Sequence, residues 1–232
     1  MSARYAIYWT PEPAAPLAAF GAAWLGRDSA VGQDVPLVAL PGIELASHRA
    51  ATASPRRYGL HGTLKPPFAL APGATVAALE DRLAAFAAAS PAFAVPALGL
   101  ADIKGFLALV PSAPCPAIDA LAGAAVRAFN DLRAPAPQAE QERRRASGLT
   151  PRQEGNLLDW GYPYVFEDFA FHITLTERLE ASERKSFRAV LAPLVAPFCA
   201  APWTFDAVSL LRQEKPASPF VLVRRLPLGG RP

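Results

Sequence analysis

The stretch Leu60-His61-Gly62-Thr63-Leu64 has a near copy later in the chain, Phe171-His172-Ile173-Thr174-Leu175. Each stretch places a threonine two positions after a histidine, within a short apolar run typical of a β-strand. Side chains at i and i+2 of a strand leave the same face, so each stretch directs one imidazole and one hydroxyl into the same space. The sequence contains 3 histidines, and these two motifs use two of them.

The composition indicates a compact globular protein. The chain has 232 residues, of which 52% are hydrophobic and 19% are charged, which excludes a largely disordered chain. A formal net charge of +3 favours an anionic small-molecule ligand and falls short of the basic stripe of a dedicated nucleic-acid binder. Cys115 and Cys199 form no metal-type Cys-x-x-Cys pair. The N-terminus carries no signal-like segment and no stretch is apolar enough to span a membrane, so we expect a cytoplasmic protein.

The order of expected elements repeats after each motif. A histidine strand, a helix and two strands follow one another twice, and the two histidines lie 111 residues apart (172 − 61). Two copies at this spacing predict a single domain with an α+β fold, mostly antiparallel sheets around a central cleft and helices outside. Its two lobes span about 1–133 and 157–232 and can exchange strands. Residues 134–156 are polar and basic and read as a helical insertion or lid. The expected strands are 4–9, 57–64, 93–100, 105–110, 169–176, 204–212 and 220–225, and the expected helices are 14–25, 75–90, 118–132, 137–146, 150–160 and 182–198, with 27–55 irregular.

The motifs and their flanks resemble a known superfamily. Arg57-Tyr58-Gly59-Leu60-His61-Gly62-Thr63-Leu64-Lys65-Pro66-Pro67-Phe68, and Trp160-Gly161-Tyr162-Pro163-Tyr164 ahead of the second motif, resemble the two-histidine (2H) phosphoesterases, in particular a bacterial branch associated with phosphonate-utilisation operons. The resemblance covers nearly the whole chain. It implies a metal-independent cyclic phosphodiesterase of phosphonate metabolism without a cofactor, acting on a small phosphorylated substrate such as a ribose cyclic phosphate, with other proteins of that pathway as partners.

The residue types suit such chemistry. Imidazole is the side chain whose ordinary pKa lies near neutrality, so His61 and His172 could act as a general acid and a general base. The hydroxyls of Thr63 and Thr174 could hold the phosphoryl oxygens. The resemblance implies the same roles, and the sequence leaves open which histidine is the base.

Strand alternation adds candidates around the four motif residues. Lys65 and Arg57 fall on the same face as His61 if the strand runs from 57 onward, and either cation could bind a second anionic group. Tyr162 and Tyr164 could wall the cleft, and Tyr8 lies on the more polar face of the first strand. Arg143, Arg144 and Arg145 read as a solvated helix face, with a phosphate-contacting lid as the alternative. His48 lacks the motif and reads as a surface histidine.

Other functions remain open at this stage. RNA 2′,3′-cyclic phosphate ends are an alternative substrate, disfavoured because no basic and aromatic track accompanies the motifs. A non-catalytic protein that binds an anionic ligand is a second alternative, although such a protein needs cations more than titrating imidazoles. A metal site is disfavoured because no carboxylate or cysteine stands at ligand spacing from either histidine.

Overall fold

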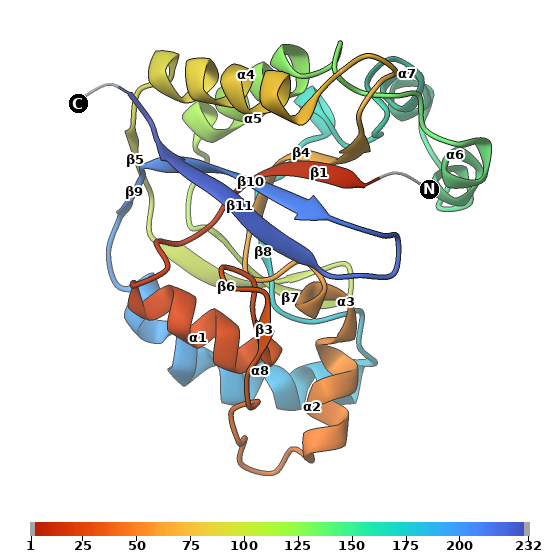
Figure 1. The fold of residues 1–232 in the computed structure, drawn as a ribbon. Helices are drawn as coiled ribbons and strands as arrows, with labels where there is room; N and C mark the ends of the chain where they lie inside the picture. The colour runs from red at the N-terminus through yellow and green to blue at the C-terminus, as the bar shows by residue number, and fades with distance from the viewer. Residues whose placement is uncertain (1–2, 230–232) are drawn as a thin grey trace.

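The computed structural model describes residues 3–229, which form an α+β fold (Figure 1). Within that range it contains eight α-helices, and every strand pair is antiparallel. Seven strands make one sheet in the order β11-β10-β1-β4-β8-β7-β6. The expected α+β class with mostly antiparallel sheets is confirmed. The strands of this sheet are β1 (Arg4–Trp9), β4 (Gly62–Ala69), β6 (Leu98–Ile103), β7 (Phe106–Pro111), β8 (Ile173–Thr174), β10 (Ala207–Gln213) and β11 (Phe220–Pro227).

Strands from distant parts of the sequence alternate across the sheet. The C-terminal strand β10 pairs with β1 and carries β11 at one edge, whereas β7 from the middle of the chain pairs with β8 and carries β6 at the other edge. The strands that follow the two motif histidines, β4 and β8, are direct neighbours at the centre. This order brings two segments more than a hundred residues apart into one ladder.

Helices lie above and below the sheet in the view of Figure 1. Helix α4 (Val76–Ala89) packs on β10 and β11, α5 (Pro116–Ala128) on β4, and α8 (Ala181–Val195) on β7. Helix α1 (Pro16–Leu25) lies beside α8 in the view. The core between helices and sheet is built from large buried side chains, including Trp24, Phe129, Phe187 and Phe205.

Local capping signals place several helix ends. Gly26 ends α1 with a φ of 69°, a left-handed conformation that glycine adopts without strain. The Thr75 hydroxyl accepts a hydrogen bond from the backbone N–H of Ala78 at the start of α4. Thr150 and Gln153 form a capping box at the start of α7 (Pro151–Trp160). These ends agree with the predicted boundaries because each signal acts within one turn.

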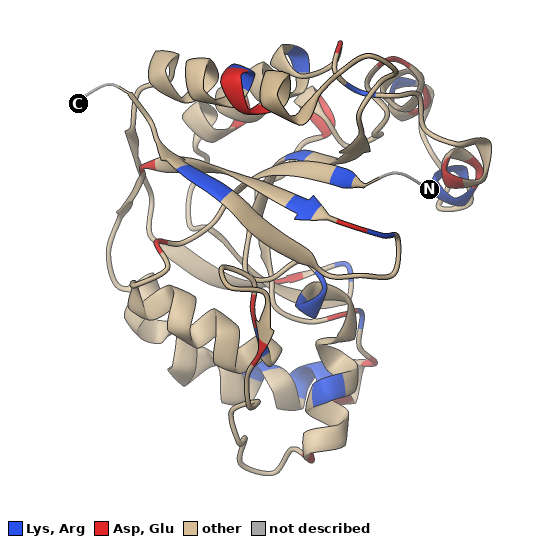
Figure 2. Ribbon diagram, in the orientation of Figure 1, with Lys and Arg blue, Asp and Glu red and all other residues tan. Residues whose placement is uncertain are grey.

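The basic part of the chain forms the helix α6 (Gln138–Arg145), close to the predicted range. Figure 2 shows its basic residues at the same side of the molecule as the start of β1. Arg145 binds Glu154 across 2.7 Å and so ties α6 to α7.

The expectation of an irregular segment at 27–55 is wrong in part. The segment contains β2 (Arg27–Asp28), β3 (Gln33–Asp34), α2 (Leu45–Ala51) and most of α3 (Ala53–Arg56). His48 lies on α2 and is buried, with 1% of its surface exposed, against Trp24. The surface reading of His48 is therefore wrong, because packing by α1 and α8 covers a helix whose sequence carries no strong signal.

The two histidine strands also differ from the expectation. The first begins at Gly62 rather than at 57 and continues through Pro66 and Pro67 to Ala69. Proline is tolerated there because β4 pairs with β8 only through Gly62, so most of its second edge has no ladder partner. The second strand, β8, has two residues. A separate pair joins β5 (Phe93–Val95) to β9 (Trp203–Phe205).

Among residues 3–229, no helix has both the length and the apolar character that crossing a bilayer requires.

Candidate functional site

The four motif side chains lie together on one face of the sheet. Strands β4 and β8 pair with Gly62 opposite Ile173. Continuing this antiparallel register by one residue in each direction places His61 opposite Thr174 and Thr63 opposite His172. Such directly opposed pairs have Cβ atoms about 5 Å apart. All four side chains are half-buried, whereas Gly62 and Ile173 between them are buried on the other face. Two imidazoles and two hydroxyls thus form one square, which we call the two-histidine site.

The backbone fixes both imidazoles in the same way. Nδ1 of His61 lies 2.8 Å from the carbonyl oxygen of Gly59, and Nδ1 of His172 lies 2.8 Å from that of Ala170. A carbonyl oxygen only accepts, so each Nδ1 carries the proton in the neutral ring. Each Nε2 therefore keeps its lone pair and is available to a ligand.

Two tyrosines surround His61. The Tyr8 ring stacks on the imidazole at 4.0 Å between centroids, and the Tyr58 ring lies at 5.7 Å. Burial is the main cause that lowers the pKa of His61 to about 4; the nearby His172 adds to the lowering, and the Gly59 hydrogen bond opposes it. His61 is therefore neutral at pH 7.

His172 has different neighbours. Its ring lies 5.6 Å from that of Phe106 on β7, and Thr174 pairs with Ala108 on the same strand. The phenyl ring of Phe171 packs directly over Gly62, where an added Cβ would come within 2.3 Å of it. Only glycine leaves room between His61 and Thr63 for the residue that precedes the second histidine.

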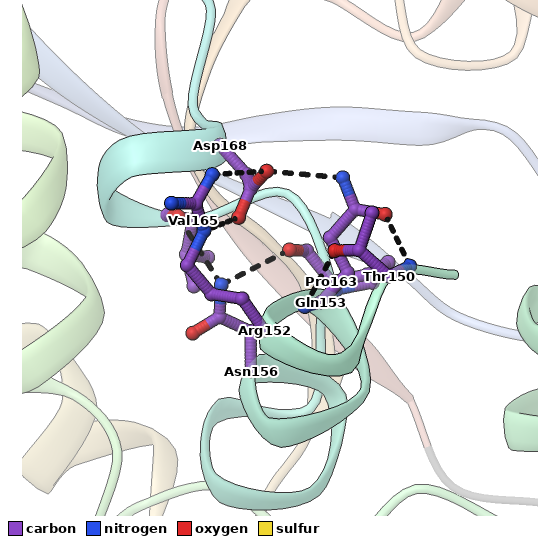
Figure 3. A network of polar contacts seen from close by, with 7 residues as sticks. All are labelled: Thr150, Arg152, Gln153, Asn156, Pro163, Val165 and Asp168. Atoms are coloured by element: carbon purple, nitrogen blue, oxygen red, sulfur yellow. Dashed lines mark hydrogen bonds and ion pairs between the residues drawn. The ribbon is translucent and has the colours of Figure 1, made fainter.

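A polar network holds the segment that leads to the second motif (Figure 3). The Asp168 carboxylate accepts hydrogen bonds from Arg152 at 2.7 and 3.0 Å and from Gln153 at 3.0 Å. The Asn156 amide donates to the carbonyl oxygens of Pro163 and Val165. Helix α7 thereby fixes the chain just before His172.

The predicted tyrosines fall at different distances from the site. Tyr8 is buried beside His61, and its pKa is raised by burial and by the neighbouring Tyr58 and Tyr162. The Tyr162 ring lies 5.6 Å from that of Tyr164 and 4.6 Å from the Arg144 guanidinium. Tyr164 is 37% exposed, and its hydroxyl lies 3.4 Å from Ser147 at the end of α6.

The two predicted cations do not join the motif residues. A β-bulge between the Tyr8–Thr63 and Ile7–Lys65 pairs reverses the alternation. Lys65 is 1% exposed and donates to the carbonyl oxygen of Val126 on α5 at 3.0 Å. Burial lowers its pKa to about 7. Arg57 follows α3 rather than standing on a strand, and it donates to the carbonyl oxygen of Pro216 at 2.8 Å.

Sequence reasoning missed several neighbours of the site. Tyr58 and Phe106 contact the histidine rings, and the carbonyls of Gly59 and Ala170 orient them. Tyr58 and Gly59 stand in the quoted flank of the first motif, so the flank carried a signal that alternation alone did not use. Within residues 3–229, no three His, Cys, Asp or Glu side chains lie close enough to hold a metal ion.

The chain belongs to a family described as a protein of unknown function (DUF1045), whose model matches residues 63–221. The match begins at Thr63, inside the first motif, and ends at Val221 near the start of β11. It shows this family and leaves membership of the 2H superfamily a prediction.

Two relatives carry a more specific name. A ribose 1,5-bisphosphate phosphokinase PhnN of Janthinobacterium sp. (strain Marseille) is 39% identical over 235 residues, covering 98% of this chain and 51% of that protein. A protein of the same name in Laribacter hongkongensis (strain HLHK9) is 39% identical over 186 residues, covering 80% of this chain and 43% of that protein. The chain thus spans about half the length of these curated relatives or less.

These names overturn the prediction of a metal-independent phosphoesterase. The relatives are named for transfer of a phosphoryl group to ribose 1,5-bisphosphate, not for hydrolysis of a cyclic phosphate. The hydrolase prediction and its RNA-end alternative are therefore wrong. The motif suggested hydrolysis because paired imidazoles suit any reaction that moves protons near a phosphate.

Proposed function

We propose that this chain binds a phosphorylated ribose in the two-histidine site and positions it for phosphoryl transfer. The observation that carries the proposal is the square of His61, Thr174, Thr63 and His172 on one face of the central sheet. The relatives' name supplies the ligand, ribose 1,5-bisphosphate, which we take as the ligand of this chain also.

The groups of the site match the groups of such a ligand. The two threonine hydroxyls can donate to phosphate oxygens, and hydrogen bonds to a charged acceptor are stronger than neutral ones. The neutral His61 ring offers its Nε2 as an acceptor for a ribose hydroxyl, because Nδ1–H is engaged by Gly59. Phosphoryl transfer depends mainly on positioning and on stabilising charge, so a site that holds the acceptor in one orientation contributes directly to the rate.

We place the binding site of the phosphoryl donor outside these 232 residues. The 232 residues contain no Gly-Lys pair, so the G-x-x-x-x-G-K-[ST] loop that cradles nucleotide phosphates in many phosphoryl transferases has no match. We infer that the nucleotide binds to a phosphokinase partner, in the same polypeptide or in a separate one, corresponding to the part of the relatives that this chain does not match.

The resemblance to the 2H superfamily is retained as a proposal about ancestry. The order strand, helix and three strands occurs twice, as β4-α4-β5-β6-β7 and as β8-α8-β9-β10-β11. This repeat supports a duplicated origin, with lobes near 1–133 and 157–232 and an insertion at 134–156. A ribose-phosphate ligand fits the expected link to phosphonate metabolism. The cytoplasmic location stays a prediction.

Direct binding tests the proposal. Titration calorimetry would measure the Kd of ribose 1,5-bisphosphate and ribose 5-phosphate for the wild type and for a Thr63→Val, Thr174→Val double variant. Each lost hydrogen bond to a charged phosphate costs about 1.5–3 kcal/mol, so we expect at least a roughly 10-fold weaker Kd. Thr204→Val is the matched control, because Thr204 is an exposed strand threonine on β9.

Two results would contradict the proposal. One is a wild-type protein that binds neither ribose phosphate at millimolar concentration. The other is a double variant that binds both as tightly as the Thr204→Val control. If the wild type binds the sugar, a separate ribose-bisphosphate phosphokinase and nucleotide are added to the complex. ³¹P NMR then shows whether the bound sugar is the phosphoryl acceptor.

A further inference from the structure

A cavity lined by Tyr58, whose ring lies 5.7 Å from that of His61, borders the two-histidine site. It has a volume of about 580 Å³ and opens between the start of β1, the end of β4, residues 133–137 and helix α6. Ligand pockets of small molecules commonly have volumes of about 300–1,000 Å³. The charged residues that line it are five arginines, Arg4, Arg57, Arg133, Arg143 and Arg144, and one acid, Glu140. We call this cavity the arginine pocket.

The positive charge of the pocket is largely uncompensated. Glu140 is shared by Arg144 at 2.8 Å and Arg143 at 3.9 Å. The other three arginines are held by neutral acceptors: Arg4 by the Gln213 amide oxygen, Arg57 by the Pro216 carbonyl, and Arg133 by the Asn130 amide oxygen and by carbonyl oxygens.

Neutral acceptors orient a guanidinium group without cancelling its charge. Like charges gathered in one hollow repel one another, and an anion bound among them would relieve that repulsion. Arg144 adds a second sign of an unfilled site, because its Nε is buried and has no hydrogen-bond partner among the described residues. Guanidinium groups bind phosphate through paired N–H donors, so phosphate is the ligand group that this lining suits.

One aromatic layer separates the pocket from the two-histidine site. Tyr58 lines the pocket, and its ring lies 5.7 Å from that of His61. The Arg144 guanidinium lies 4.6 Å from the ring centre of Tyr162, and the Tyr8 ring stacks on His61 at 4.0 Å. The pocket and the two-histidine site therefore share Tyr58 as a common wall.

We propose that the arginine pocket binds the second phosphate of the ligand whose first phosphate is held by the two threonines. This inference rests on the proposed function for the first phosphate, and it adds the ligand class: a sugar carrying two phosphates rather than one. Helix α6 then contributes directly to binding, because it supplies Arg143, Arg144 and Glu140 to the pocket wall.

The test compares ligands with one and two phosphates. The variant is Arg57→Gln with Arg143→Gln, because Arg57 is exposed and the Arg143 side chain is 73% exposed, so neither supports the core. The control is Arg49→Gln with Arg188→Gln, which removes equal charge from exposed positions on α2 and α8. Calorimetry measures the Kd of ribose 1,5-bisphosphate and of ribose 5-phosphate for each protein.

We expect the pocket variant to bind the bisphosphate roughly 10- to 100-fold more weakly, because two charge-assisted contacts are lost. Its Kd for the monophosphate should change less than about 2-fold, and the control variant should match the wild type for both. Equal weakening for both ligands, or no weakening for the bisphosphate, would overturn the inference. If the threonine double variant loses bisphosphate binding and the pocket variant does not, the proposed function stands and the inference about the arginine pocket is overturned.

A second measurement separates the two proposals when no sugar binds. Crystals of the wild type would be soaked with inorganic phosphate. Phosphate within hydrogen-bond distance of at least two of the five arginines supports the pocket even if the two-histidine site stays empty, in which case only the proposed function fails. An arginine pocket without phosphate, with or without phosphate at the threonines, contradicts the inference.

Discussion

The two motif histidines share one backbone interaction and differ in almost everything around it. Each Nδ1 lies 2.8 Å from the carbonyl oxygen two residues earlier, Gly59 for His61 and Ala170 for His172. His61, however, precedes an eight-residue strand and lies against Tyr8 and Tyr58, whereas His172 precedes a two-residue strand and lies near Phe106.

Local structure and tertiary packing set different properties of these histidines. The motif and its local backbone fix the tautomer, because the carbonyl acceptor is two residues away in both copies. Tertiary packing sets the proton affinity, because burial lowers the pKa of His61 to about 4. Equal motifs therefore lie in two different environments, and the following experiments test that difference and its structural origin.

The largest effect is expected at Lys65, where the first motif strand departs from simple alternation. Burial lowers its pKa to about 7 from 10.5, a difference worth about 5 kcal/mol. Because the folded pKa is lowered, the contribution of Lys65 to stability is complete above pH 10.5 and is lost as the pH falls towards 7. We expect the wild type to gain about 3 kcal/mol relative to Lys65→Met between pH 7 and pH 9.5, measured by urea unfolding. Parallel pH profiles would mean that Lys65 faces solvent in the cleft after all.

The second effect concerns the pKa of His61 itself. With a folded pKa of about 4 and an ordinary value near 6.5, the wild type should lose stability as the pH falls from about 6.5 to 4, because the unfolded chain takes up the proton first. We expect the free energy of unfolding to fall by about 2–3 kcal/mol more in the wild type than in His61→Gln between pH 7 and pH 4.5. The buried His48 titrates in both proteins and cancels from the comparison. An unchanged pH profile in His61→Gln would show that this ring is as solvated as a free imidazole.

The third effect tests the contact that joins the two motifs. A methyl group added at Gly62 would come within 2.3 Å of the Phe171 ring, so Gly62→Ala should cost about 1–3 kcal/mol through overpacking. Phe171→Leu in the same chain should recover part of that loss. Gly155→Ala is the matched control, since nothing lies within 4 Å of its added methyl and alanine favours the α7 helix. Equal free energies of unfolding for Gly62→Ala and the wild type would show that packing of Phe171 over Gly62 does not join the two motifs.

The smallest effect distinguishes the supports of the two histidines. Thr150 caps α7, which holds the segment before His172, and Thr75 caps α4, which does not. Either threonine changed to alanine should cost about 1 kcal/mol. Only Thr150→Ala should shift the His172 imidazole resonances in ¹H–¹⁵N NMR spectra. Equal shifts of His172 in both variants would argue against a positioning role for the network in Figure 3.

Several features were predictable because their causes lie within one helical turn or one strand. Gly26, Thr75 and Gly161 end or begin helices where the sequence placed them, and β1 spans the expected 4–9. Helix α2, of which only His48 and Ala51 are buried, was missed because its apolar residues give no clear period. Lys65 was misplaced because a bulge depends on how β1 and β4 pair, and no residue of β4 signals that shift by itself.

The sequence by itself determined the α+β class, the helix ends at Gly26, Thr75 and Gly161, and the placement of a histidine and a threonine on one side of each motif, because these follow from local periodicity and capping. Only the tertiary structure decided that β4 and β8 are neighbours, that His61 is the more buried imidazole, and that arginines from β1, α6 and the segments after α3 and α5 surround a single cavity. The physical reason is that register, burial and shared charge arise between segments far apart in the chain, where packing rather than local preference has the larger free energy.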